Sequence, residues 1–98
     1  MIKHKIIKRL IERFKLELNF NLIEIRDYWD ANLLAIGLVR GDKLVYIVAK
    51  ILDNRIVLYD YDFEILDEEH LDNLNVIKEV RDVTENELVH AIKDYLNV

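Results

Sequence analysis

The middle of the chain constrains the fold most, because it reads as three β-strands joined by two very short turns. Residues 33–39 form a continuous apolar run, residues 44–52 are rich in strand-forming side chains, and residues 55–63 alternate between two faces. Only residues 40–43 and 53–54 separate these runs, so consecutive strands must run antiparallel. We therefore expect an antiparallel sheet at the centre of the molecule.

Helical patterns flank this central region on both sides. Near the N-terminus an apolar side chain recurs at every fourth position, which predicts an amphipathic helix over residues 2–18. The apolar positions are Ile2, Ile6, Leu10, Phe14 and Leu18, and Ile7 and Ile11 widen the stripe. Near the C-terminus the sequence Thr84-Glu85-Asn86-Glu87 is a capping-box pattern, which predicts a helix that runs to about Leu96.

Three weaker patterns complete the expected order of elements. Residues 22–26 alternate like a short strand, Asp67 can cap a short helix over residues 68–74, and residues 76–80 can form another strand. The expected order is therefore α-β-β-β-β-α-β-α. We predict a single small α+β domain over residues 1–98, with a mainly antiparallel sheet of about four or five strands and the helices on one side.

The composition excludes several kinds of site. The chain has no cysteine, which excludes disulfides, a thiolate nucleophile and a cysteine zinc site. Its two glycines, Gly37 and Gly41, are too few for a phosphate-binding glycine loop, and its three histidines lack a metal-binding spacing. We therefore predict no cofactor and no bound metal.

Hydropathy and charge limit the environment in which the chain works. The apolar content of 52% is too high for a disordered chain, yet no apolar run is long enough to span a membrane and no signal peptide is evident. We therefore expect a soluble cytoplasmic protein without membrane contact. The net charge is −5, but residues 1–18 are basic, whereas residues 56–74 hold seven acidic residues and no lysine or arginine. This distribution disfavours wrapping by nucleic acid but allows a local basic contact face.

Two segments in the middle of the chain resemble the core of the PD-(D/E)xK nuclease family. They are Trp29-Asp30-Ala31-Asn32-Leu33-Leu34-Ala35-Ile36 and Gly41-Asp42-Lys43-Leu44-Val45-Tyr46-Ile47-Val48-Ala49-Lys50. That family places an acidic residue before an apolar strand and a Glu-x-Lys motif at the end of the next strand. The resemblance implies a restriction-endonuclease-like fold, in which carboxylates hold a magnesium-type ion and the lysine activates the attacking water.

The catalytic positions of that family are matched only in part. Lys50 matches the lysine, Asp30 or Asn32 stands at the first acidic position, and Glu12 lies where some members carry a helical glutamate. Val48 occupies the glutamate position of Glu-x-Lys, and a valine cannot bind a metal. The resemblance therefore implies a nuclease-like fold more strongly than it implies nuclease activity.

The helix expected near the N-terminus carries a basic surface. Its basic side chains are Lys5, Lys8, Arg9, Arg13 and Lys15. They can contact the phosphates of a nucleic acid or an acidic partner. The alternative is that they only keep an exposed helix soluble.

Acidic and aromatic side chains give further candidate surfaces. Asp60, Asp62 and Glu64 share one face of an expected strand, where they can bind a divalent ion, face solvent or protect a sheet edge from pairing. The aromatic side chains on the other face of that strand form either a part of the core or a platform for bases. Tyr28 and Trp29 lie in an expected loop, where they can anchor a protein contact or cover the end of the core.

Together these features favour a non-catalytic interaction or regulatory protein that works through a surface, with a protein partner or a second copy of itself. The first alternative is a nucleic-acid-binding protein of degenerate nuclease-like fold, which uses the basic face of the N-terminal helix. The second alternative is a metal-dependent nuclease, with Asp30, Lys50 and Glu12 as its candidate catalytic residues.

Overall fold

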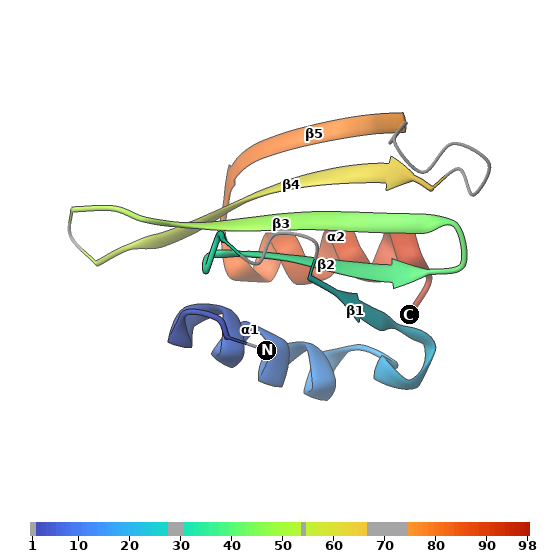
Figure 1. Cartoon of the computed structure of the whole chain (residues 1–98), viewed down its shortest axis with the longest axis horizontal. Coiled ribbons are helices and arrows are strands. Elements are labelled where there is room, and N and C mark those ends of the chain that lie inside the picture. Colours follow the sequence, from blue (N-terminus) through green and yellow to red (C-terminus); the bar gives the residue numbers. More distant parts are fainter. Residues whose placement is uncertain (1, 28–30, 54, 67–74) are drawn as a thin grey trace.

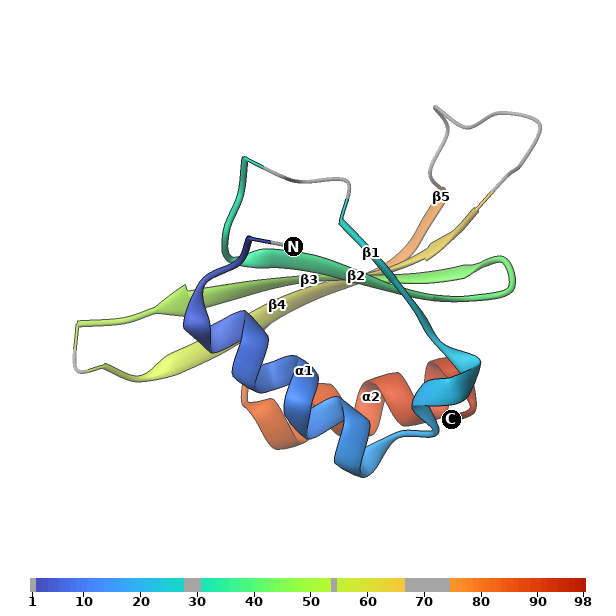
Figure 2. The same cartoon turned by 60° about the horizontal axis from the view of Figure 1, so that its bottom comes forward.

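The computed structural model describes residues 2–27, 31–53, 55–66 and 75–98, which form a five-stranded antiparallel sheet with two α-helices on one face (Figures 1 and 2). The strands lie side by side in the order β1-β2-β3-β4-β5. The elements are α1 (Lys5–Glu17), the 3₁₀-helix η1 (Phe20–Leu22), β1 (Glu24–Arg26), β2 (Ala35–Arg40), β3 (Lys43–Ile51), β4 (Val57–Ile65), β5 (Asn75–Val83) and α2 (Glu85–Leu96). The predicted α+β fold with a mainly antiparallel sheet is confirmed.

The three central strands follow the sequence pattern closely. β2 and β3 are joined by a two-residue turn, across which Arg40 pairs with Lys43. Gly41 in this turn has a φ of +61°, a conformation that glycine adopts without strain. β3 and β4 then pair along their whole length, with Ile51 opposite Val57 at the far end.

The two edges of the sheet differ from the expectation. β1 is only three residues long, because the start of the predicted strand over residues 22–26 is taken by η1. β5 extends over nine residues instead of residues 76–80, because it pairs with β4 from Tyr59 to Ile65. The helix expected over residues 68–74 lies outside the described residues.

The helix α1 packs on the sheet through Ile7, Leu10, Ile11 and Phe14, which are all buried. Four residues turn an α-helix by about 400°, so a strict four-residue repeat drifts by about 40° at each step. Ile2, the first residue of the predicted stripe, precedes the helix and is 82% exposed. The predicted stripe is therefore right for the centre of the helix and wrong at its N-terminal end.

The helix α2 begins with the capping box that the sequence predicts. The Glu87 backbone N–H donates to the Thr84 hydroxyl, and the Thr84 backbone N–H donates to the Glu87 carboxylate, each over 3.2 Å. The buried side chains of α2 are Leu88, Val89, Ile92 and Leu96. The ring of Tyr95 stacks on Phe63 of β4, with the ring centroids 4.0 Å apart.

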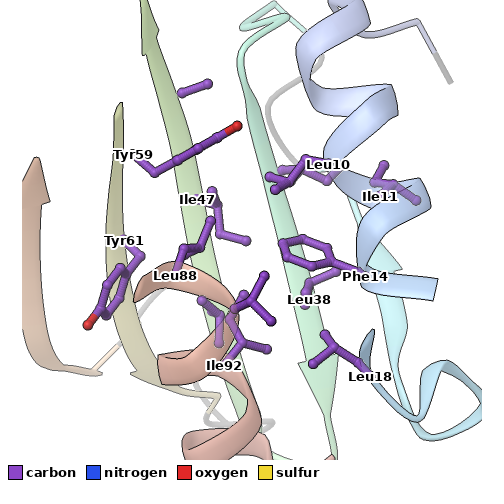
Figure 3. Close-up of a cluster of buried hydrophobic side chains, with 14 of the residues drawn as sticks. Leu10, Ile11, Phe14, Leu18, Leu38, Ile47, Tyr59, Tyr61, Leu88 and Ile92 are labelled. Carbon is purple, nitrogen blue, oxygen red and sulfur yellow. The ribbon is translucent and has the colours of Figure 1, made fainter. Parts of the chain in front are cut away.

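The aromatic side chains of β4 face the helices and belong to the core. Tyr59, Tyr61 and Phe63 are all less than 10% exposed, so they are not available as a platform for stacking bases. Figure 3 shows Tyr59 and Tyr61 near Leu88 of α2, and Phe14 reaching from α1 toward the sheet. One continuous cluster therefore joins both helices to the sheet.

Candidate interaction surfaces

Two of the residues expected in a nuclease-like site, Glu12 and Lys50, lie on opposite sides of the sheet. Glu12 is exposed on α1, where its carboxylate accepts a hydrogen bond from Lys15 over 3.1 Å. Lys50 lies on the opposite face of the sheet, since its neighbour Ala49 points into the helix-covered core. Asp30 lies outside the described residues. Glu12 and Lys50 therefore cannot act on the same substrate atoms.

Lys50 is instead held by two aspartates on the open face of the sheet. Its Nζ lies 2.9 Å from Asp60 on β4 and also donates to Asp82 at the end of β5. The hydrogen bonds to Asp82 and Asp60 raise the pKa of Lys50 above its ordinary value. Burial acts to raise the pKa of Asp60, but the Asp82 backbone N–H and Lys50 outweigh it and lower that pKa. Lys50 therefore joins β3 to β4 and β5 through ion pairs, and it is not an unpaired side chain that could act as a base.

The three carboxylates expected on one face of β4 do lie on that face, but two of them are paired with cations. Arg81 of β5 donates to Asp62 over 3.0 Å, and it lies 3.8 Å from Asp60. Within the described parts of the chain, no three histidine, aspartate or glutamate side chains are placed to hold a metal ion. The cluster lies at a β-bulge of β5 between Val80 and Val83, beyond which the pairing with β4 resumes, and Asp82 adopts a φ of +60° there.

The third carboxylate, Glu64, is almost completely buried on the open face. Only 4% of its surface is exposed. Burial, with the nearby carboxylates of Asp62 and Glu79, raises the pKa of Glu64 above its ordinary value. A solvated face was one of the expectations for this residue, and burial shows that expectation to be wrong for Glu64.

The five basic side chains of α1 divide into two groups. Arg13 donates to Glu85 over 2.5 Å and to Asn86 over 2.6 Å, so it joins α1 to the start of α2. Lys15 pairs with Glu12 within α1. The remaining three side chains, Lys5, Lys8 and Arg9, are exposed and make no ion pair with the described residues. The available basic surface is therefore smaller than the sequence predicts.

The two aromatic residues expected to contact a protein partner, Tyr28 and Trp29, lie outside the described residues. The largest exposed apolar side chains near them in sequence are Leu22 and Leu33, which are 43% and 46% exposed. Exposed apolar side chains of this kind are common on protein surfaces and do not by themselves indicate a site.

A groove of about 580 Å³ lies between β5 and α2 on the helix-covered face of the sheet. It forms because α2 packs against β4 and leaves this face of β5 open. Its apolar and aromatic lining residues are Tyr61, Phe63, Val80, Val83, Ala91 and Tyr95. Its charged or titratable lining residues are Lys78, Glu87, His90 and Asp94. The groove thus has an apolar floor and a polar rim, as sites for side chains of a ligand commonly do.

The polar groups at the rim of the groove are held by structural contacts. Glu87 belongs to the capping box, and His90 Nε2 lies 3.4 Å from Asp94 Oδ2 one turn later on α2. Lys78 Nζ lies 5.9 Å from the centre of the Phe63 ring. These groups define the edges of the groove. The apolar surface that a ligand can reach between them comes mainly from the partly exposed Val80, Ala91 and Tyr95, since Tyr61, Phe63 and Val83 are buried beneath.

The groove and the edge of β5 were not predicted from the sequence. The pattern over residues 75–83 has no clean alternation, and seven of its nine side chains are exposed. The position of α2 over β4 rather than β5 depends on the pairing of distant segments, which a local pattern does not encode. The only sequence signal for this surface is the mixture of apolar and charged residues over residues 75–83, which is typical of an exposed strand.

No family model, no curated protein and no solved structure matches this chain. None of the helices in the described part of the chain is long and apolar enough to cross a membrane.

Proposed function

We propose that this protein is a non-catalytic interaction protein that binds a segment of a partner protein in the groove between β5 and α2. The observation that carries the proposal is the groove itself, with its volume of about 580 Å³ and its apolar floor. Its partly exposed apolar residues, Val80, Ala91 and Tyr95, offer a contact surface for apolar side chains of a bound segment. Burial of those side chains would supply the affinity.

The rim of the groove favours a partner segment that is apolar with basic residues beside it. Glu87 and Asp94 line one wall of the groove on α2, and Lys78 on β5 is the only lysine or arginine among the lining residues. A basic side chain of the partner meets opposite charge along α2. Such rim charges set orientation and association rate more than affinity.

The role of the groove is tested by selecting binding peptides from a random library against the full chain. Ala91→Arg fills the groove with a long side chain, at little cost to the helix, because arginine is a good helix former. Lys93→Arg is the matched control, because Lys93 is exposed on α2 and does not line the groove. We expect selected peptides to lose at least tenfold in affinity for the Ala91→Arg variant and to bind the Lys93→Arg variant normally.

Two outcomes contradict the proposal. Either no binding peptide is recovered, or the recovered peptides bind the two variants equally well. Thermal unfolding of both variants must show that they remain folded, so that a loss of binding reports on the groove.

A second candidate function is weak contact with nucleic acid through Lys5, Lys8 and Arg9. The observation that favours it is that these three side chains are exposed and free of ion pairs with the described residues. Three phosphate contacts give a slope of about −2.7 in log affinity against log salt for duplex DNA. We expect the double variant Lys8→Glu with Arg9→Glu to abolish binding at low salt. Binding that survives this change, or that survives high salt, excludes α1 as the contact surface.

A further inference from the structure

We infer that β5 pairs with β5 of a second copy of this chain, antiparallel and about a twofold axis that passes through Val80. The inference uses the outer edge of β5 and not the groove, so it stands or falls independently of the proposed function.

The outer edge of β5 is the long open edge of the sheet. Among the described strands, β5 has a neighbour only on the β4 side, and it is nine residues long. The opposite edge, β1, is three residues long. In Figure 1, β5 forms the edge farthest from α1. An edge strand presents unpaired backbone N–H and C=O groups, which another strand can pair with.

Symmetry restricts how two copies of β5 can pair. An antiparallel pairing of two identical edges places the twofold axis perpendicular to the sheet, and side chains directly opposite each other point to the same face. One residue of each strand must then lie on the axis, opposite its own copy. When that residue is charged, the pairing brings two like charges together, which is unfavourable.

Only one register of β5 avoids like charges while using most of the strand. An axis at Lys78, Glu79, Arg81 or Asp82 sets that residue against itself. An axis at Ile77 pairs only residues 75–79 of the strand, whereas an axis at Val80 pairs residues 77–83. An axis at Val80 sets an apolar residue against itself near the centre of the exposed strand. The sequence of β5 therefore singles out the register centred on Val80.

In this register the charges on the open face are complementary. Within one copy, Arg81 contacts Asp62 and lies 3.8 Å from Glu79. In the dimer, Glu79 of each copy also lies opposite Arg81 of the other copy, which adds two pairs of opposite charge across the axis. Both side chains point to the open face, since Glu79 pairs in register with Asp62, and Arg81 also contacts Asp62. The next residues, Lys78 and Asp82, add no pair, because Lys78 lies beside Phe63 on the helix-covered face, whereas Asp82 lies at the bulge on the open face and contacts Lys50.

The charges on this edge have a second interpretation, because charged edge strands commonly prevent aggregation. A protective edge needs no complementarity with itself, whereas β5 is complementary to its own reverse about Val80. This arrangement of charges disfavours pairing of β5 with most other strands but favours pairing with β5 of a second copy. In the resulting dimer the two sheets form one continuous sheet of ten strands, and the two grooves beside α2 adjoin across the axis.

Sedimentation equilibrium of the full chain over a wide concentration range tests this dimer. We expect reversible association of the wild-type chain to a dimer. Glu79→Arg places two arginines opposite each other at two sites, and we expect it to raise the dissociation constant about 10- to 30-fold. Glu12→Arg is the matched control, because it makes the same change of charge on the exposed face of α1.

A mixing experiment separates the register from any effect on folding. Glu79→Arg and Arg81→Glu each create like-charge pairs in their own dimers, but together they form a heterodimer in which both pairs are again opposite in charge. We expect the mixture to associate more tightly than either variant alone. A single cysteine at the axis, Val80→Cys, gives a second readout in this cysteine-free chain, and we expect it to form an intermolecular disulfide much faster than Glu12→Cys.

The inference is overturned if the wild-type chain is monomeric at every concentration, if Glu79→Arg and Glu12→Arg have equal effects, or if the mixture fails to associate. A monomeric chain whose selected peptides still respond to Ala91→Arg retains the proposed function and loses the dimer. A chain that forms the dimer but whose groove binds no peptide retains the inferred dimer and loses the proposed function.

Discussion

Replacing Phe14 with alanine tests whether α1 belongs to the core of a single subunit. Phe14 is completely buried, and it lies in the cluster that joins α1 to the sheet (Figure 3). Emptying the site of a buried phenylalanine lowers the free energy of unfolding by about 3–5 kcal/mol. Because domains of this size are stable by roughly 5–15 kcal/mol in total, we expect Phe14→Ala to lose a large fraction of that stability.

The assay is urea denaturation of Phe14→Ala beside Lys8→Ala, followed by circular dichroism. Lys8 is exposed on the opposite side of α1, so its loss should change stability by less than about 0.5 kcal/mol. With a urea dependence of about 1–3 kcal/mol/M, the Phe14→Ala midpoint should fall by about 1 M or more. Equal, small shifts for both variants would refute the packing of α1 on its own sheet. A midpoint that moves with protein concentration would then indicate that α1 packs on a second subunit.

Three further experiments test other parts of the structure. Because the pKa of Glu64 is raised, the folded chain keeps this carboxyl protonated at pH values above its ordinary pKa of 4.5, so the free energy of unfolding falls as pH rises through this region. We expect Glu64→Gln to raise the urea midpoint at pH 7 and to lose this advantage below about pH 4. The Lys3 side chain is completely buried with its Nζ 2.7 Å from Asp27, so Lys3→Ala should cost about 3 kcal/mol, against almost nothing for the exposed Lys5→Ala. A plasmid assay with magnesium should show no cleavage, because Lys50 is held in ion pairs; cleavage that Lys50→Ala removes would reverse this conclusion.

The sequence predicts those elements whose patterns are local. Gly41 marks the turn between β2 and β3, and Thr84 with Glu87 marks the start of α2 through a capping box that needs only four residues. The strict alternation over residues 57–63 places Tyr59 and Tyr61 toward the helices, because period-two patterns define the faces of a strand.

The candidate surfaces depend on contacts between distant segments, so the sequence alone misses them. Arg13 looks like a free basic residue in the sequence, but Glu85 and Asn86 of α2 accept its hydrogen bonds. The groove depends on where α2 crosses the sheet. The length of β5 depends on its pairing with β4, and its own residues favour a strand only weakly.

The central claim is that the groove between β5 and α2 is the binding surface, and titration of the isotope-labelled chain with a selected peptide tests it most directly. In two-dimensional NMR spectra, we expect the largest shift changes at the amides of Val80, Ala91 and Tyr95, which line the groove. The amides of Lys8 on α1 and Tyr46 on the open face should remain unchanged. Shift changes centred on α1 or on the open face, with Ala91 and Val80 unaffected, would contradict the account.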